Sequence, residues 1–480
     1  MVTPETRTLD PLLVDGFASM VHGQVLLPGS PGYDDARSVR NGMIDRRPAL
    51  IVRASGTRDV VDAVTFAREH GLTLSVRGGG HNVAGNAVND GGLVIDLSRM
   101  RAVHVDPSAS ELRAQGGATW GDLDRESQLY GMSVPGGVVS TTGIGGLTLH
   151  GGLGHLRRRD GLSIDNLLEV EIVTADGRVL TASEQEHADL FWAVRGAGSN
   201  FGVVTSMRFR MRPIGPMVFL CGVAYPQENS GPLIRAWRDW VVDAPDEVSS
   251  LALLWNVPDA DAFPPDLRDR PAFLVAAIHC GPPEEAERAT KPLRELAEPM
   301  LDLSHPELFA HVQSAFDPFF PVGRRYYWKS SYLDDFSDAA VDVIEEAGRA
   351  RPSGMSSVTL WHLGGAIARV DPTATAYFRR DAPFLLTAEA TWEDAGADEG
   401  NIAWARKALE YARPYSHGGA YLNFPGFGEE RDTMLRATYG ANFDRLGAVK
   451  TRYDPDNVFH MNQNIRPADH CMPTREKPSP

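Results

Sequence analysis

The chain has 480 residues, and at about 150 residues per domain this length predicts two to four domains rather than a lone small binding module. Lys and Arg total 47 against 63 for Asp and Glu, and the formal net charge of −16 disfavours nucleic acids and anionic membrane surfaces as partners. The apolar runs are far shorter than the ~20 residues of a membrane span and no secretory signal opens the chain, so we expect a cytoplasmic protein.

Helical and extended patterns alternate over the first 210 residues. Apolar runs bounded by turn residues predict strands, and apolar residues at helical spacing predict helices. Thr119 is the expected N-cap of one helix, and Asp176–Gly177 suits the turn of a hairpin because both positions tolerate positive φ. The predicted strands are 50–54, 72–76, 93–97, 103–105, 168–174 and 178–181, and the predicted helices are 59–70 and 120–130.

The pattern changes near Pro213, where glycines become sparser and strands alternate with helix-like stretches up to about residue 424. We therefore expect a second domain over 213–424, followed by a helical tail over 431–450. The strands predicted in the second domain are 218–223, 250–255, 273–278, 359–363 and 384–391.

Two stretches concentrate the glycines of the first domain. One is Arg77–Asn82, followed by Gly85, directly after a predicted strand, and the other runs from Gly136 to Gly154. Glycine lets peptide N–H groups approach an anion closely, so successive glycines suit the diphosphate of a dinucleotide. Neither stretch has the spacing of the Rossmann fingerprint. A purely structural role for these loops remains open at this point.

A longer series of ordered motifs resembles one known family. The series resembles the berberine-bridge-enzyme branch of the vanillyl-alcohol-oxidase flavoproteins, which have the PCMH-type FAD-binding fold. In the first domain it comprises Arg77-Gly-Gly-Gly-His81, Gly91–Leu97, Gly143–Gly146, Gly161-Leu162, Asp165–Leu167, Asp189–Gly196 and Phe201–Thr205. In the tail it comprises Tyr439-Gly440, Tyr453-Asp454-Pro455 and Asn462–Ile465.

The resemblance implies a two-domain α+β fold. FAD would be held by residues 1–212 together with 425–480, below a substrate domain of antiparallel sheet over 213–424. It also implies a covalent bond from a ring nitrogen of His81 to the 8α-methyl of the flavin. Many relatives add a cysteinyl link, but Val139 stands at that position, so we expect a single link, as in singly linked bacterial members. A lone histidine is otherwise more often structural.

The resemblance places the expected cofactor-binding residues in the glycine loops, at or beside the motif Phe201–Thr205, and in the tail. They are Arg77, Gly78, Gly79, Gly80, His81, Asn82, Gly85, Gly137, Val139, Thr141, Thr142, Gly145, Gly146, Gly202, Val203, Asn462 and Asn464. The resemblance also suggests that Thr142 lies near the position that controls the reaction of the flavin with O2.

Oxidation of a C–H bond by a flavin also needs a proton acceptor. Along the strand 384–392, alternation places Glu389 as a lone carboxylate on one face, where burial would suit it as a base. A solvent-facing glutamate on an edge strand is the alternative. Tyr421 and Asn423 are the other candidate catalytic residues, because they resemble the family's Tyr-x-Asn-Tyr stretch. Phe424 replaces the tyrosine that serves as base in several relatives, so the role of base would pass to Glu389, Tyr421, a histidine of the pocket or the substrate's own ionisation. Simple core packing is the alternative for Tyr421.

Three further histidines and a run of arginines were also considered as site residues. His150, His155 and His362 lack the spacing of metal ligands, so we predict no metal and leave open a site or core role. Arg157-Arg158-Arg159 is interpreted as solvated surface, with steering of an anionic substrate as the alternative.

The predicted function is an FAD-dependent oxidase. Its substrate would be a small molecule or secondary metabolite oxidised at a C–O, C–N or activated C–H bond, and O2 would be reduced to H2O2. Three alternatives are a non-redox cyclase that retains its flavin, an FAD-dependent dehydrogenase with poor O2 reactivity, and a metabolite-binding protein without flavin. We expect a monomer or homodimer, and the sequence names no substrate.

Overall fold

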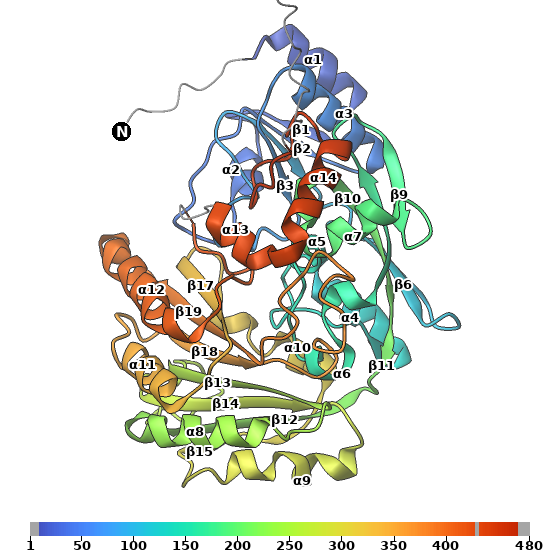
Figure 1. The fold of residues 1–480 in the computed structure, drawn as a ribbon. Helices are drawn as coiled ribbons and strands as arrows, with labels where there is room; N and C mark the ends of the chain where they lie inside the picture. Colours follow the sequence, from blue (N-terminus) through green and yellow to red (C-terminus); the bar gives the residue numbers. More distant parts are fainter. Residues whose placement is uncertain (1–8, 428–431, 469–480) are drawn as a thin grey trace, which may run out of the picture.

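A computed structural model describes residues 9–427 and 432–468 (Figure 1). Helices and antiparallel sheets are combined, so the predicted α+β class is confirmed. The predicted domain ranges include 1–8, 428–431 and 469–480, which lie outside the described residues, and the domain boundaries remain predictions. Within the described ranges, every helix is too short or too polar to cross a bilayer.

The first sheet contains the parallel strands that lead into the first glycine loop. Its order is β1-β2-β4-β3, with β1 (Gln24–Leu26) antiparallel to β2 (Leu50–Arg53), and β4 (Leu93–Asp96) parallel to β2 and to β3 (Leu74–Arg77). Helix α3 (Thr57–Glu69) buries Val60, Val64 and Ala67 in the cluster that also contains Leu50 and Ile95. Helix α1 (Pro11–Met20) precedes β1, and α2 (Tyr33–Arg37) lies between β1 and β2.

The second sheet is antiparallel and has the order β5-β6-β10-β8-β9. Thr119 caps α4 (Trp120–Ser127) as expected, within a capping box formed with Asp122. The strands are β5 (Val103–Asp106), β6 (Glu111–Gln115), β8 (Leu167–Val173), β9 (Val179–Ser183) and β10 (Val203–Arg210), and β7 (Met132–Ser133) pairs separately with β11 (Arg212–Pro213). The helices nearby are α5 (Ile144–Leu149), α6 (Arg157–Asp160) and α7 (Ala188–Ala197).

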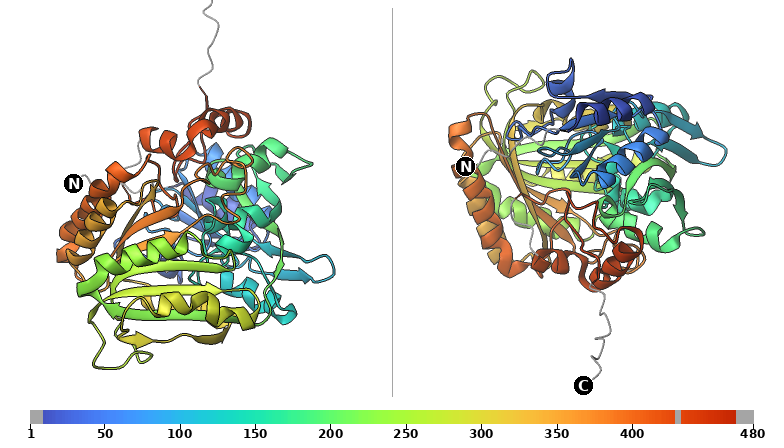
Figure 2. Two further views of the ribbon diagram at one scale, coloured as in Figure 1. Left: turned by 60° about the horizontal axis from the view of Figure 1, so that its bottom comes forward. Right: turned by 90° about the horizontal axis from the view of Figure 1, so that it is seen from above.

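The expected helical tail is two helices, α13 (Asp432–Tyr439) and α14 (Phe443–Tyr453), separated by a 3-10 turn; the expected first residue, 431, is outside the described ranges. Leu435, Tyr439, Leu446 and Val449 pack into the core of the second sheet. Figures 1 and 2 show these red helices beside the N-terminal half, which agrees with contacts between α14 and α7. The tail therefore returns to the part of the chain that contains the glycine loops.

The large antiparallel sheet has the order β15-β12-β14-β13-β18-β19-β17, and β16 also pairs with β12. Its strands are β12 (Met217–Pro226), β13 (Val248–Asn256), β14 (Pro271–His279), β15 (Leu301–Asp302), β16 (His305–Leu308), β17 (Arg325–Leu333), β18 (Ser357–His362) and β19 (Phe384–Trp392). The associated helices are α8 (Ser230–Val241), α9 (Pro283–Arg294), α10 (Phe309–Ser314), α11 (Asp338–Arg349) and α12 (Asp398–Ala412).

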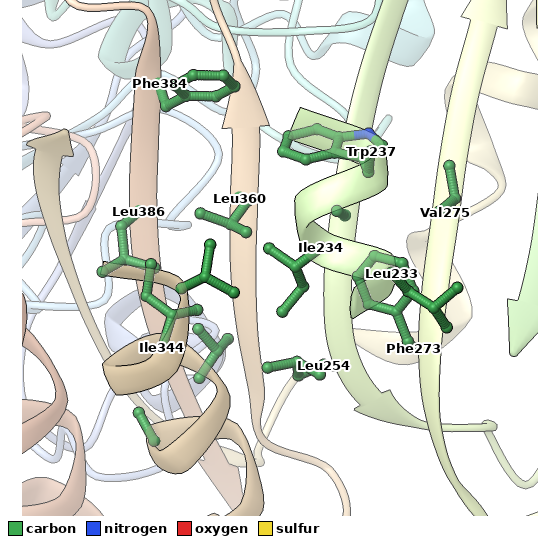
Figure 3. Close-up of a cluster of buried hydrophobic side chains, with 14 of the residues drawn as sticks. Leu233, Ile234, Trp237, Leu254, Phe273, Val275, Ile344, Leu360, Phe384 and Leu386 are labelled. Carbon is green, nitrogen blue, oxygen red and sulfur yellow. The ribbon is translucent and has the colours of Figure 1, made fainter. Parts of the chain in front are cut away.

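The two faces of this sheet have different partners. Helices α8, α9, α11 and α12 cover the outer face (Figure 1), where Trp237 and Ile344 meet Leu360 and Leu386 in the apolar cluster of Figure 3. The opposite face packs Leu385 and other side chains toward the N-terminal half. Because side chains alternate along β19, the residues that do not face the helices face the other domain.

Three expectations about this architecture were incomplete or wrong. The sequence analysis missed several strands, of which β17 forms an edge of the large sheet. The missed strands are β1, β6, β7, β10, β11, β15, β16 and β17. The interpretation of Arg157–Arg159 as solvated surface is wrong for its first two members, because Arg157 is 1% exposed and Arg158 is 5% exposed. Glu389 does not lie on an edge strand, since β19 pairs with both β18 and β17.

Candidate functional site

One cavity lies where the glycine loops of the N-terminal half meet the inner face of the large sheet. The first loop follows β3 and the second precedes and enters α5. The two loops touch backbone to backbone, because a Cβ on Gly79 would collide with Gly143. Gly80 has φ of +68°, a conformation that side-chain-bearing residues rarely adopt. Glycine is therefore required where the loops cross.

Most of the expected cofactor residues line this cavity. Those that line it are Gly78, Gly79, Gly80, His81, Asn82, Gly137, Val139, Thr142, Gly145, Gly146, Gly202, Val203 and Asn462. Four expected residues are not among the lining residues. Arg77 forms an ion pair with Asp96 at 3.2 Å, and Gly85 lies against the side chain of Ile44. Thr141 Oγ1 lies 3.0 Å from His81 Nε2, and the buried Oδ1 of Asn464 has no partner among the described residues.

The imidazole of His81 is held by hydrogen bonds on both nitrogens. Arg40 Nε donates to His81 Nε2 at 3.1 Å, and Thr141 Oγ1 lies 3.0 Å from the same nitrogen. Because Nε2 accepts from Arg40, the ring proton of the neutral tautomer is on Nδ1, which lies 3.1 Å from Thr142 Oγ1. Burial, and then the charge of Arg40, hold the pKa of His81 well below its usual value. The ring is therefore neutral at physiological pH.

Sequence reasoning missed Arg40, which lies in the loop after α2 and belongs to none of the motifs. Its Nη2 also donates to Thr141 Oγ1 at 2.7 Å, so it joins the first glycine loop to the second. Burial lowers the pKa of Arg40, but its ordinary value is so high that the guanidinium stays charged. Only its distance from His81 in the fold could have revealed it.

Glu389 lies in the cavity wall supplied by the large sheet. The carboxylate accepts hydrogen bonds from Thr387 Oγ1 at 2.7 Å and from Ser357 Oγ at 3.1 Å. Burial raises its pKa, and these hydrogen bonds oppose the rise only in part. The residue is 7% exposed, so the solvent-facing alternative is wrong. A carboxylate of this kind can accept a proton close to neutral pH.

Tyr421 and Asn423 also line the cavity, but they are joined to each other. Tyr421 Oη accepts from the backbone N–H groups of Gly152 and Leu153 at 3.2 and 2.9 Å, and from Asn423 Nδ2 at 2.9 Å. Burial raises the pKa of Tyr421 to about 12, so its phenol is neutral at physiological pH. These contacts make Tyr421 a support of the second glycine loop.

Four aromatic side chains surround the carboxylate end of the cavity, and sequence reasoning assigned no site role to them. Phe320 and Trp328 pack at 5.3 Å between ring centroids, and Trp328 and Phe424 pack at 5.5 Å, both nearly perpendicular. Trp361 lies 6.2 Å from Phe424 and donates its indole N–H to Thr387. Trp328 escaped notice because β17 was not predicted as a strand.

The cavity suits a dinucleotide that carries a flat ring system. A Cβ on Gly146 would meet no atom within 4 Å, which shows that the bare backbone of this loop faces open space. Unhindered peptide N–H groups suit a diphosphate, and neutral His81 has a nitrogen lone pair for a covalent bond. The residues present therefore fit FAD.

The arginines and histidines that the sequence analysis also considered lie in or around the walls of the cavity. Arg157 donates to the carbonyls of Gly154, Ser250 and His362, and thus joins the glycine loop to the large sheet. Arg158 donates to His362 Nε2 at 2.8 Å. His150 lines the cavity, whereas His155 and His362 are buried outside it. Within the described residues, no three His, Cys, Asp or Glu side chains cluster as metal ligands.

Comparisons with known proteins agree with this geometry. Residues 48–183 match the family described as an FAD binding domain, and residues 420–466 match the family described as berberine and berberine like. The (R)-6-hydroxynicotine oxidase of Paenarthrobacter nicotinovorans is 33% identical over 470 residues, covering 93% of this chain and 97% of that protein. The xylooligosaccharide oxidase of Thermothelomyces thermophilus is 29% identical over 460 residues, covering 89% of each chain.

The crystal structure of 6-hydroxy-D-nicotine oxidase from Arthrobacter nicotinovorans has the same fold, with a TM-score of 0.82 and 30% sequence identity. The match covers 93% of this chain and 98% of that one. Fold, cavity and relatives together define an enzyme, an FAD-linked oxidoreductase. The chain belongs to the berberine-bridge-enzyme-like family of these enzymes, as its motifs predict.

Proposed function

We propose that this protein is an oxidase that binds FAD through a covalent bond to His81 and oxidises a small molecule. Bound FAD would accept a hydride from the substrate and pass both electrons to O2, which is released as H2O2. The observation that carries the proposal is the neutral His81 imidazole at the junction of two glycine loops, opposite a buried carboxylate in the same cavity.

The geometry also favours one nitrogen of His81 for the bond. Arg40 donates to Nε2, so Nδ1 can lose its proton and form a new bond while the contact with Arg40 remains. Thr142 Oγ1 is the nearest acceptor for that proton, at 3.1 Å. We therefore assign the link to Nδ1, with Val139 in place of a second, cysteinyl link.

Glu389 is the proposed catalytic base. A substrate that loses a hydride must also lose a proton, and Glu389 is a buried carboxylate on the wall opposite the glycine loops. Tyr421 and Asn423 act by holding the loop at Gly152–Leu153 in place. Thr387 and Ser357 orient the carboxylate by donating to one oxygen each.

The link is tested with the His81→Ala variant. Intact mass spectrometry and acid precipitation should show FAD attached to the wild-type chain and released from, or absent in, the variant. The control is His150→Ala, which removes another cavity histidine and should leave the attachment unchanged. Acid-stable yellow colour in His81→Ala would refute the assignment.

The oxidase assignment is tested by substrate reduction followed by aeration. Flavin that is bleached by an oxidisable small molecule without O2 should regain its colour in air, with one H2O2 formed per substrate oxidised. Recolouring without H2O2, or only with an added dye, would indicate a dehydrogenase. A product formed with no bleaching would indicate a non-redox cyclase.

A further inference from the structure

A second cleft lies on the outer face of the large sheet, on the side away from the glycine loops. The last turn of α8, the segment 243–247 that leads into β13, and one face of α9 form its walls. Both helices cover this face of the sheet in Figure 1. Among the described residues, those that line this cleft and those that line the cavity suited to FAD do not overlap. The two sites are therefore separate.

Negative charge dominates this outer cleft. Four carboxylates and one guanidinium line it, those of Asp239, Asp243, Glu247, Glu285 and Arg288. Asp239 pairs with Arg238 at 2.8 Å, whereas the other three carboxylates form no ion pair with a described residue. The C-terminal end of α8 adds the partial negative charge of its free carbonyls. A cleft lined mainly by one sign of charge concentrates ions of the opposite sign.

A buried histidine without a hydrogen-bond partner lies among these carboxylates. His279 is the last residue of β14, lines the outer cleft and is 2% exposed. Its Nδ1 has no hydrogen-bond partner among the described residues. The side chain of Glu247 is close to the ring, because a Cβ on Gly281 would lie 2.8 Å from Glu247 Cγ and 3.0 Å from His279 Cε1.

The imidazole of His279 is neutral at physiological pH. Burial lowers its pKa, and the carboxylates of Glu247 and Glu285 oppose this fall only in part. A neutral imidazole has one nitrogen with a lone pair, which can accept a hydrogen bond from a ligand. Buried polar groups in proteins are almost always hydrogen-bonded, so an unpartnered imidazole in the wall of a cleft points to a ligand.

The size of the outer cleft suits an organic molecule. Its volume is about 400 Å³, which is typical of a site for a small molecule. Trp240, in the last turn of α8, gives it an aromatic wall that attracts organic cations. A metal ion fits less well, because within the described part of the chain no three His, Cys, Asp or Glu side chains are arranged as metal ligands.

We propose that the outer cleft binds a linear aliphatic polyamine. One ammonium group donates to the imidazole of His279 and pairs with Glu247, and a second pairs with Glu285 on α9. The methylene chain between the two ammonium groups packs along Trp240. An anion would be repelled by the carboxylates, and a neutral molecule would leave them without a countercharge. The proposal does not involve the flavin, so it is independent of the oxidase function.

The test measures binding of three probes to the purified protein with its FAD, by isothermal titration calorimetry at pH 7.5 and physiological ionic strength. Spermidine is a linear triamine that is cationic at this pH, 1,8-octanediol has nearly the same length without the charge, and ZnCl2 probes for a metal site. We expect one spermidine to bind per chain, at least about tenfold more tightly than the diol, because charge-assisted hydrogen bonds discriminate by that factor.

Two double variants separate the outer cleft from the surface charge around it. Glu247→Gln/Glu285→Gln removes two carboxylates of the cleft and should weaken spermidine binding about tenfold or more. Glu284→Gln/Glu287→Gln removes two exposed carboxylates of α9 that do not line the cleft, and should leave the dissociation constant unchanged. His279→Leu should also weaken binding, because it removes the acceptor on the imidazole.

Thermal unfolding gives a second measurement of the same binding. Spermidine should raise the melting temperature of the wild type and of Glu284→Gln/Glu287→Gln, but not that of Glu247→Gln/Glu285→Gln, because a ligand stabilises only a protein that binds it. The FAD content of each variant, determined by mass and absorbance, checks that the fold is retained.

Four results would overturn the polyamine site. They are no binding of spermidine to the wild type, equal binding of the diol, an equal loss of binding in the two double variants, and displacement of spermidine by stoichiometric Zn2+. The third would assign the binding to diffuse surface charge, and the fourth would assign the cleft to a metal. None of these results bears on the reduction of the flavin or on its reaction with O2, so the oxidase function would stand.

Discussion

The contact between Arg40 and His81 would prepare the histidine for the proposed covalent bond. Burial, and then the charge of Arg40, lower the pKa of the ring, so His81 stays neutral. Arg40 also donates to Nε2, which holds the ring in one orientation. A nitrogen that forms a bond to carbon needs its lone pair, which a protonated imidazole lacks. Arg40 therefore acts as a positioning residue for the expected attachment of FAD.

Replacement of Arg40 by methionine should slow this attachment. The loss of the donor frees the ring, and the loss of the charge lets the pKa of His81 rise. We expect apoprotein incubated with FAD to gain the mass of the cofactor at least about tenfold more slowly than the wild type, from the loss of one charged hydrogen bond. Arg99→Met, which removes an exposed arginine, is the control. An unchanged rate would exclude the role.

Glu389 gives a pH dependence whose direction follows from its raised pKa. The base must be ionised to accept a proton, so flavin reduction should be slow below the raised pKa and faster above it. Anaerobic stopped-flow measurements from pH 5 to 9 test this expectation. Glu389→Gln should be slow at every pH, with FAD content unchanged; a variant that keeps the wild-type profile would remove Glu389 from the mechanism.

Asp124 in α4 is a buried carboxyl outside the cavity, and burial raises its pKa to about 7. The unfolded chain loses this proton near pH 4, whereas the folded chain keeps it up to about 7. The free energy of unfolding should therefore fall as pH rises through this range, by roughly 3 to 5 kcal/mol, and then level off. Asp124→Asn should remove this fall in urea denaturation, whereas Asp15→Asn, at an exposed position, should leave it unchanged.

At the scale of elements, β19 explains why one glutamate reaches the cavity. Leu386, Ala388 and Ala390 pack under the outer helices, whereas the residues between them point to the opposite face. The alternation was predictable from the sequence, because the side-chain period of a strand is fixed. Which face was covered by helices was not predictable, because that depends on the order of β18, β19 and β17 in the sheet.

A substitution at Tyr421 distinguishes two roles for this residue, support of the second glycine loop and catalytic base. In Tyr421→Phe, the N–H groups of Gly152 and Leu153 lose their acceptor, which should lower the free energy of unfolding by about 1 to 3 kcal/mol and weaken FAD retention. Urea denaturation and flavin release measure both effects, and Tyr130→Phe, at an exposed position, is the control. Unchanged stability with slow flavin reduction would instead indicate a catalytic base.

At the scale of the molecule, a buried ion pair joins the two halves around the cavity. Arg380, in the loop before β19, donates to both oxygens of Asp165 at 2.8 Å, and its side chain is 1% exposed. Asp165→Asn would leave the guanidinium buried without its countercharge, which costs about 3 to 5 kcal/mol. Urea denaturation should show this loss, whereas Asp444→Asn in the exposed pair with Arg436 should have little effect. An equal effect of the two would contradict the assigned role.

The sequence by itself determined the family, the α+β class and the two glycine loops, because ordered motifs and periodicity are local in the chain. It also predicted roles for His81 and Glu389, since one follows a glycine loop and the other interrupts an uncharged strand, and both side chains line the cavity. Only the tertiary structure brought Arg40 to His81, placed Trp328 and Phe320 around Glu389, and buried Arg157 between the halves. These contacts join residues far apart in sequence, and their partners are set by strand order and domain packing, which no local pattern encodes.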